Sequence, residues 1–438
     1  MYITIGNTKI GPGFPPYVIA EMSANHNGSI DNAYKIIDMA NIAGADAVKL
    51  QTYRPDTITM DMSTPEFMIK GGLGDGKSLY ELYEGAFMPW EWHKPLFEYA
   101  KKIAITIFSS PFDNTAVDLL EDLNTPAYKI ASFEAVDLPL IKYVAQTGKP
   151  MIISTGMANS EEIQEAIEAA REGGCKDLAI LHCVSSYPAP AADYNLRTLT
   201  DMQDKFGLVT GLSDHTIDNT TAITSVALGV SIIEKHVTLD RNAGGPDDSF
   251  SLEFEELKDL CADSKTAWES LGQVDYGIKS SEQSNVKFRR SLYFVKGIKA
   301  GEIITKENVR SIRPGYGLPV KYFEDILGMK VTKDVLLGTR LSFDLVKWYS
   351  YIIDEDILNT NTFIFRVDAS EKIGTGHLQR CLLLAKYFIN KEDWDVIFLT
   401  QQTQSEIIIN QAGFKCIKVS EKYSSVSDFI KTLNKPAV

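Results

Sequence analysis

The sequence of 438 residues lacks long hydrophobic runs, a surplus of positive charge and closely spaced cysteines. No segment approaches the roughly 18 consecutive apolar residues of a membrane-spanning helix, and no apolar stretch follows a basic N-terminus. The net charge of -14 and the absence of a block rich in Lys and Arg argue against nucleic acid or an anionic membrane as the main partner. We therefore expect a cytoplasmic protein that binds neither.

Cysteines are few, odd in number and far apart in the chain: Cys175, Cys183, Cys261, Cys381 and Cys416. This spacing does not match a metal-binding pattern, so we expect five reduced thiols. Cys183 stands next to His182 at the end of an apolar run, which raises the question of a nucleophilic role. Adjacent residues of a strand point to opposite faces, so the pattern favours a buried thiol.

What the chain does contain is a series of eight short apolar runs that each carry polar residues at their end. They span residues 18–22, 46–52, 105–110, 127–132, 151–156, 178–183, 207–216 and 230–238. Helix-like stretches lie between them, and Ser29, Asp113 and Asp137 are start signals for three of these. The alternation predicts an α/β fold, a (β/α)8 TIM barrel over residues 1–272. An open doubly wound sheet is the alternative, but it would not bring polar residues from all eight strand ends to one site.

Three features depart from the simple alternation. Residues 53–88 form a long insertion, which predicts a lid or a substrate wall at the catalytic rim. After a polar linker at 273–290, short strands with Gly and Pro punctuation predict a small, mostly β domain over residues 291–348. A second linker, 349–361, leads to a strand, a Gly-rich turn and a helix, so residues 362–438 read as a partial Rossmann-like segment.

Two lysines stand at strand ends beside small hydroxyl residues. Lys49 and Lys129 are the lysines, and the hydroxyl residues are Ser110, Ser132, Ser154 and Ser213. Two ammonium groups with several hydroxyl donors suit a phosphate and a carboxylate held together, because charge-assisted hydrogen bonds are the strongest. The set therefore predicts a small phosphorylated acid as a ligand.

Two histidines, His215 and His236, close the seventh and eighth runs, which are neighbours in a barrel. Two neutral imidazoles at one rim suit a divalent first-row metal with positions left open for substrate. A lone histidine at a strand end is more often a hydrogen-bonded structural residue, and the pairing is what favours a metal. Glu21, Asp214 and Asp247 are candidate acids near this pair.

Several motifs, in order along the chain, resemble the sialic acid synthase family and most closely its pseudaminic acid synthase branch. They are IAEMSANHNGS, GADAVKLQTY, FSSPFD, YKIASFE, ISTGM, LSDHT, IEKH and RPGYG, and the resemblance covers about residues 1–348. It implies a TIM barrel followed by an antifreeze-like (β-clip) domain, in a domain-swapped homodimer. The implied reaction condenses phosphoenolpyruvate with an open-chain N-acylated amino sugar. That sugar is 2,4-diacetamido-2,4,6-trideoxy-L-altrose, giving pseudaminate and phosphate, while N-acetylneuraminate or legionaminate synthesis remains the alternative.

The resemblance also assigns roles residue by residue. Phosphoenolpyruvate would be held by Lys49, Gln51, Ser110, Lys129, Ser132, Ser154 and Ser213. His215 and His236 would bind a divalent metal ion; Mn²⁺ is the expected ion, and Mg²⁺ and Co²⁺ are the alternatives. Sugar contacts or proton transfers would fall to Glu21, Tyr187 and Asp247, and Arg313 would reach the N-acyl group across the dimer. Ser185 stands where the N-acetylneuraminate branch usually has Asn, which fits a different sugar.

The C-terminal stretch RVDASEKIGTGHLQRCLLLA resembles the start of the UDP-sugar hydrolase that releases the 2,4-diacetamido sugar. It lacks the nucleotide-binding half, so we expect no hydrolase activity from it. Two other functional hypotheses are a metal-dependent aldolase or epimerase barrel that needs no phosphoenolpyruvate, and an ice or carbohydrate binder built on the antifreeze-like segment. The polar strand ends argue against the last of these.

Overall fold

The computed structural model describes residues 1–70, 76–346, 362–366, 376–391, 395–400 and 403–418. The chain divides into two compact units, Met1–Asp275 and Tyr276–Val438, which are described separately. No helix among the described residues is both long enough and apolar enough to cross a membrane. No disulfide bond joins cysteines in the described residues: Cys175 and Cys183 are buried, and the other three cysteines are half-buried.

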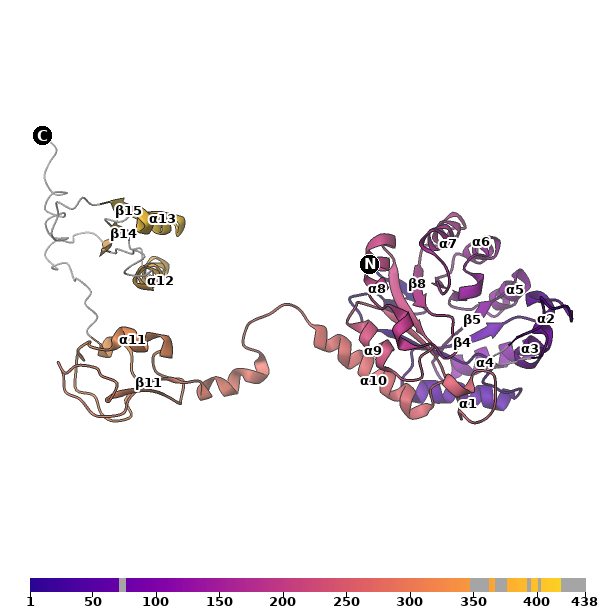
Figure 1. Ribbon diagram of the computed structural model, residues 1–438, viewed down its shortest axis with the longest axis horizontal. Coiled ribbons are helices and arrows are strands. Elements are labelled where there is room, and N and C mark those ends of the chain that lie inside the picture. The colour runs from indigo at the N-terminus through magenta and orange to yellow at the C-terminus, as the bar shows by residue number, and fades with distance from the viewer. Residues whose placement is uncertain (71–75, 347–361, 367–375, 392–394, 401–402, 419–438) are drawn as a thin grey trace, which may run out of the picture. The chain divides into compact units, whose positions relative to one another are not determined.

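Eight parallel strands close into a barrel in the first unit, which confirms the predicted fold and excludes the open sheet (Figure 1). In spatial order the barrel runs β10-β3-β4-β5-β6-β7-β8-β9. The strands are β3 (Tyr17–Glu21), β4 (Ala47–Thr52), β5 (Thr106–Pro111), β6 (Tyr128–Ile130), β7 (Met151–Ser154), β8 (Leu178–Cys183), β9 (Val209–Asp214) and β10 (Ile232–His236). Each overlaps one of the eight apolar runs, and only β3 and β5 extend beyond theirs, by one residue each.

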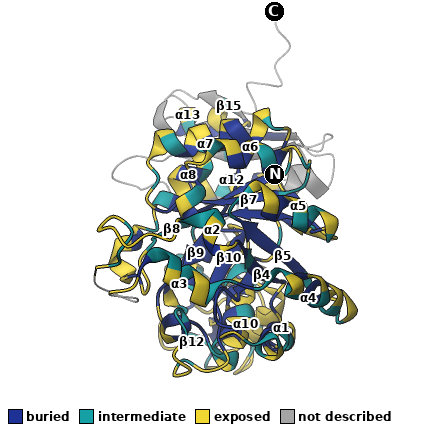
Figure 2. Cartoon of the chain, turned by 90° about the vertical axis from the view of Figure 1, so that its right-hand side faces the viewer, coloured by how far each residue is buried: buried dark blue, intermediate teal, exposed yellow. Residues whose placement is uncertain are grey.

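Helices between the strands form the outer layer of the barrel. They are α1 (Ile30–Ala43), α4 (Trp90–Lys102), α5 (Asn114–Asp122), α6 (Leu138–Ala145), α7 (Ser160–Glu172), α8 (Thr198–Phe206), α9 (Thr220–Val226) and α10 (Phe254–Leu271). The predicted start signals act as N-caps: Ser29 accepts a hydrogen bond from the Asn32 amide, and Asp113 and Asp137 cap α5 and α6 in the same way. Figure 2 shows the strands buried and the outward faces of the helices exposed.

Alternation along each strand separates two hydrophobic cores. Val18, Val48 and Ile153 point outward and pack against the helices, whereas Ile19 and Ala47 point into the barrel. A short hairpin, β1 (Ile3–Ile5) and β2 (Thr8–Ile10), adds its isoleucines to this inner core. The inner core therefore fills the end of the barrel where the strands begin, and it leaves the opposite end for polar side chains.

The insertion between β4 and α4 is more ordered than the sequence suggested. It contains α2 (Pro55–Ile58) and α3 (Leu79–Ala86), with residues 71–75 outside the described part. A capping box starts α3, in which the Ser78 hydroxyl accepts from the Glu81 amide and the Glu81 carboxylate accepts from the Ser78 amide. The apolar periodicity of this eight-residue helix is too short to stand out in the sequence.

The second unit begins with a 3-10 segment, η4 (Ser280–Phe288), followed by a small β domain. Its strands β11 (Ser291–Phe294) and β12 (Val309–Ile312) pair antiparallel, and a short helix, α11 (Phe323–Ile326), completes it. Isolated bridges such as Ile298 with Val335 extend the pairing around a core of its own. This agrees with the predicted small, mostly β domain.

The C-terminal segment forms a three-stranded parallel sheet in the order β13-β14-β15. Its elements are β13 (Thr362–Arg366), α12 (Gly376–Lys391), β14 (Asp395–Thr400), α13 (Thr403–Gln411) and β15 (Lys415–Lys418). The Gly-rich turn before α12 lies outside the described residues. The relation to a UDP-sugar hydrolase stays a prediction.

His93 on α4 packs in the core. Its ring is fully buried, and Nε2 lies 2.8 Å from the Thr52 hydroxyl on the outer face of β4. Burial lowers the pKa of His93 from 6.5 to about 4. The folded protein therefore holds this imidazole neutral at pH values where the unfolded chain binds a proton.

This difference predicts an acid-sensitive contribution to stability. Because the unfolded state takes up the proton below about pH 6.5, the free energy of unfolding should fall between pH 6.5 and 4, by about 2 kcal/mol at pH 5 from His93 alone. Chemical denaturation at pH 7 and pH 5 measures the change. His93→Gln cannot titrate and should show a smaller loss than the native protein. An equal loss in both would contradict the assignment.

Candidate active site

Polar side chains form a layer above the inner core, at the end of the barrel where the strands finish. They lie two residues beyond inward-pointing apolar residues, because successive inward positions are two apart. The residues of this layer are Glu21, Lys49, Ser110, Lys129, Ser154, Cys183, Ser213 and Glu234. Backbone register places Glu21 beside Lys49 on one side and His236 on the other. A cavity of about 420 Å³ opens above the layer.

Glu234 joins the two buried lysines. Its Oε1 atom lies 3.1 Å from the Lys129 ammonium and 3.3 Å from the Lys49 ammonium. Lys49 in turn lies 2.8 Å from Glu21 Oε2. All four side chains are at most 4% exposed. The sequence predicted two ammonium groups beside hydroxyl donors, and the structure adds that the two lysines alternate with two glutamates.

The charge states of this cluster follow from burial and pairing together. Burial alone would raise the pKa of Glu234, but the ammonium groups of Lys129 and Lys49 lower it to about 2. For Lys49, burial is outweighed by Glu21 and Glu234, and its pKa rises. Burial dominates for Glu21 and raises its pKa, and burial likewise lowers the pKa of Lys129. Glu21 and Lys129 are therefore the members of the cluster that most readily become neutral.

The two predicted metal ligands come together at this rim. His215 follows β9 and His236 ends β10, and their ring centroids are 5.3 Å apart. His215 Nδ1 lies 2.8 Å from the Val184 carbonyl oxygen, so Nδ1 carries the proton and Nε2 keeps a free lone pair. Burial lowers the pKa of His236 well below 6.5. Contacts with Cys183 outweigh burial and raise the pKa of His215, so its ring presents Nε2 as an acceptor only in the neutral form, whereas His236 is held neutral; metal binding requires the neutral form of both.

Two histidines alone do not complete the coordination of a metal ion, so the groups around them decide whether an ion fits. Within the described residues no group of three or more His, Cys, Asp or Glu side chains is arranged to hold an ion. His236 Nδ1 is buried and has no hydrogen-bond partner in the described part of the chain, and Asp247 Oδ2 lies 3.6 Å away. The donor set fits an open divalent site, in which water or substrate oxygens fill the remaining positions.

Asp247 belongs to a polar chain on one side of the cavity. The Ser23 hydroxyl donates to Asp247 Oδ2, and the Gln51 amide donates to the Ser23 hydroxyl at 3.0 Å and to Glu21 Oε1 at 2.9 Å. Burial raises the pKa of Asp247. The Tyr187 ring lies beside the two histidines, with its centroid 4.3 Å from that of His215 and 6.0 Å from that of His236.

Most of the residues predicted from the sequence line this cavity: Lys49, Gln51, Lys129, Ser132, Ser154, Tyr187, Ser213, His215, His236 and Asp247. Glu21 and Ser110 lie below, in contact with the Lys49 ammonium. Ser185 lies behind the lining, where a Cβ atom at Gly156 would overlap the hydroxyls of Ser132 and Ser185. Arg313 follows β12 in the second unit and is exposed, so its approach to the site stays a prediction.

One predicted acid lies elsewhere. Asp214 points away from the cavity and pairs with Lys235, whose ammonium is 2.9 Å from Asp214 Oδ2. Neighbouring positions on a strand face opposite sides, so Ser213 and His215 occupy the inner face and Asp214 the outer one. Lys235 also donates to the carbonyls of Thr216 and Asp218 and thereby holds the loop that follows His215.

Sequence reasoning missed Glu234, Glu134 and Ser23. The signal for Glu234 was its spacing of two from His236 on one strand, which puts both side chains on the inner face. Glu134 lies in the short turn η1 (Ser132–Glu134), and burial raises its pKa to about 7. No pattern in the sequence distinguished it from an ordinary turn residue.

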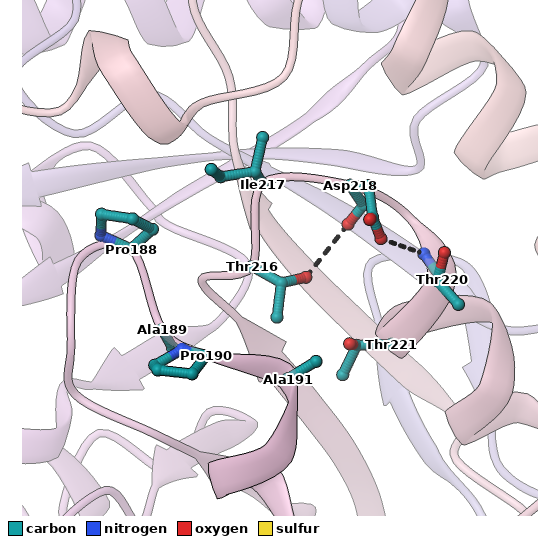
Figure 3. A pocket seen from close by; sticks show the side chains of 9 residues that line it. All are labelled: Pro188, Ala189, Pro190, Ala191, Thr216, Ile217, Asp218, Thr220 and Thr221. Carbon is teal, nitrogen blue, oxygen red and sulfur yellow. Dashed lines mark hydrogen bonds between the residues drawn. The ribbon is translucent and has the colours of Figure 1, made fainter.

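A second hollow, of about 450 Å³, lies between the loops that follow β8 and β9 (Figure 3). Pro188, Pro190 and Ile217 give it an apolar lining. Its polar groups are used internally, since the Thr216 hydroxyl donates to the Asp218 carbonyl and the Thr220 amide donates to the Asp218 carboxylate. The chemistry therefore belongs to the central cavity.

Removing the central carboxylate should destabilise the protein. In Glu234→Gln the Lys129 ammonium loses its counter-charge while buried, which should cost about 3–5 kcal/mol of the free energy of unfolding. Inorganic phosphate should raise the melting temperature of this variant more than that of the native protein. Glu255→Gln, at an exposed pair with Lys258, is the control and should change little. An unchanged melting temperature in Glu234→Gln would rule out the bridging role.

Comparison with known proteins places these residues in a family. A model described as the NeuB family matches residues 36–276, and one described as the SAF domain matches residues 289–347. Pseudaminic acid synthases of Campylobacter jejuni and Helicobacter pylori are each 43% identical to the chain, over 325 and 331 residues. The matches cover 74% and 75% of this chain and 95% and 97% of those proteins.

Solved structures agree with these matches. The spore coat polysaccharide biosynthesis protein SpsE of Bacillus subtilis is 32% identical, with a TM-score of 0.55, over 79% of this chain and 99% of that one. The N-acetylneuraminic acid synthetase of Leptospira borgpetersenii is 31% identical, with a TM-score of 0.59, over 66% and 96%. The barrel, the small β domain and these likenesses together show that the chain belongs to the NeuB family.

Proposed function

We propose that the protein is a pseudaminic acid synthase. It would condense phosphoenolpyruvate with 2,4-diacetamido-2,4,6-trideoxy-L-altrose and release phosphate. The observation that carries the proposal is the buried lysine pair beside two inward histidines in a chain 43% identical to pseudaminic acid synthases. A metal-dependent aldolase or epimerase would not need two buried cations for a phosphorylated acid.

The lysines would hold phosphoenolpyruvate by its two anionic groups. Lys49 and Lys129 are separated by the Glu234 carboxylate, so each can contact a different anionic group while the hydroxyls of Ser154 and Ser213 supply further donors. The negative charges of the glutamates offset those of the two buried ammonium groups and thereby lower the cost of burying them. This arrangement supports a dianionic ligand despite the overall charge of -14.

The condensation would proceed above this layer. Carbon 3 of phosphoenolpyruvate attacks the sugar aldehyde, water adds at carbon 2, and the resulting tetrahedral centre expels phosphate. The aldehyde oxygen takes up a proton, and the attacking water loses one. Asp247, whose pKa burial raises, can supply the first proton, while Gln51 holds Glu21 and Ser23 in place by donating to both. When a divalent metal is bound by His215 and His236, it polarises the aldehyde.

We extend the proposal to the metal and the assembly. Mn²⁺ suits two imidazoles with open positions for oxygen ligands. A homodimer would bring Arg313 of a second copy to the N-acyl group of the sugar, and Tyr187 and Ser185 would complete the sugar site. The dependence on metal and the oligomeric state can be measured together, by turnover with different ions and by sedimentation.

The test of the reaction is phosphate release from phosphoenolpyruvate with a panel of sugars. We expect release with the altrose derivative, and little with N-acetylmannosamine or the legionaminate precursor. Release only with N-acetylmannosamine or only with the legionaminate precursor would favour the corresponding alternative. A metal-dependent aldolase or epimerase would convert a sugar with no phosphate release at all, and that result would overturn the synthase proposal.

The histidines give a second prediction. His215→Ala and His236→Ala should each abolish turnover, at least about 10³-fold, because the aldehyde would lose its polarising ion. Both variants should keep melting temperatures near the native value, and titration with Mn²⁺ should show weakened binding in each. Full activity of either variant in the presence of a chelator would contradict the role of the pair.

A further inference from the structure

The cavity has an apolar side that the proposed reaction does not explain. Six residues without charge form it: Tyr53, Ile58, Leu82, Tyr83, Ala86 and Phe112. We call this set the insertion wall, because four of the six lie on α2 and α3 of the long insertion. Tyr53 and Phe112 follow β4 and β5, at the base of the same wall.

The insertion wall lies across the barrel from His215. In the closed strand order β5 is four strands from β9 in either direction, and β4 is likewise opposite β8. Phe112 therefore rises from the strand that faces the one before His215. A six-carbon sugar with its aldehyde at the histidines would extend its far end toward the wall.

Packing holds the insertion wall in shape. The Tyr53 ring makes edge contacts with Tyr83 at 5.7 Å and with Phe112 at 5.2 Å between centroids. The Trp90 indole donates to the Tyr53 carbonyl at 3.2 Å, which ties the wall to α4. A surface of this kind contacts an apolar group without first having to be ordered.

The insertion wall also has polar atoms: Tyr53 and Tyr83 carry hydroxyl groups, and Glu134 lines the same cavity. Glu134 influences Tyr83, whose pKa is raised by burial and then by this carboxylate. Glu134 Oε2 is buried and has no hydrogen-bond partner in the part of the chain that the structure describes. Ile58, Leu82, Ala86 and Phe112 offer no hydrogen-bonding side-chain atom. A hydroxyl held against these four would lose its bonds to water and gain none.

We propose that the insertion wall receives the methyl end of the acceptor and thereby selects a 6-deoxy sugar over its 6-hydroxy counterpart. This inference rests on the proposed function, and it identifies carbon 6 of the sugar as the position that the insertion wall recognises. Burying a methyl group is favourable, whereas burying a hydroxyl there is not. An apolar pocket discriminates between such neighbours by about 10- to 100-fold.

The experiment compares two acceptors that differ at one carbon. They are 2,4-diacetamido-2,4,6-trideoxy-L-altrose and 2,4-diacetamido-2,4-dideoxy-L-altrose, and kcat/KM is measured by phosphate release at saturating phosphoenolpyruvate. The native protein should prefer the deoxy sugar by about 10- to 100-fold. Leu82→Asn and Ile58→Thr, which keep the size of the side chain and add polar atoms, should each reduce this preference at least about 3-fold. KM for phosphoenolpyruvate should not change.

Glu84→Gln is the matched control, since Glu84 is an exposed residue of the same helix and does not line the cavity. It should keep the native preference. Equal use of the two sugars by the native protein, or an unchanged preference in both wall variants, would overturn the inference and leave the synthase proposal standing. Absence of phosphate release with either sugar would instead overturn the proposed function, and the inference would fall with it.

Discussion

The site depends on the carboxylate of Glu234, because Lys49 and Lys129 can remain charged inside the barrel only beside a counter-charge. Without it, two ammonium groups would lie in a protein interior with a single remaining glutamate. With it, the lysines are held before any ligand arrives. When an anion binds, the ammonium groups of Lys49 and Lys129 exchange contacts with glutamate for contacts with the anion, so they have a counter-charge throughout.

Strand alternation is the second constraint, and it sorts neighbouring residues into different tasks. On β10, Glu234 and His236 face the cavity, while Lys235 between them faces outward. Lys235 pairs with Asp214 and donates a hydrogen bond to the Thr216 carbonyl in the loop after β9. The inner faces of β9 and β10 thus carry the residues of the site, and their outer faces carry the ion pair that holds the neighbouring loop in place. A shift of one residue in the register of β10 would turn Lys235 into the barrel and turn Glu234 and His236 outward.

Much of this could be predicted from the sequence, for physical reasons. The apolar runs mark the strands because strands buried on both faces need continuous hydrophobicity, and Lys49, Lys129, His215 and His236 stood out as polar residues at their ends. Asp214 precedes His215 in the sequence and so resembles a site residue, but adjacent residues of a strand face opposite sides, and Asp214 pairs with Lys235 on the outer face. A carboxylate within a strand belongs to no recognisable motif, so the sequence does not single out Glu234. Helix α3 has only eight residues, which is too short for its apolar periodicity to be recognised. The proposed approach of Arg313 to the site needs a second copy of the chain, so it does not follow from the fold of a single chain.

The apolar hairpin at the start of the chain has a kinetic consequence. Because Ile3, Ile5 and Ile10 fill the end of the barrel where the strands begin, the polar layer can be reached only through the cavity above it. The deepest ligand must enter first and a second one must follow behind it, as in a tube closed at one end. On the proposed function, the sugar would trap phosphoenolpyruvate in place, and the order of addition would be fixed by the shape of the barrel.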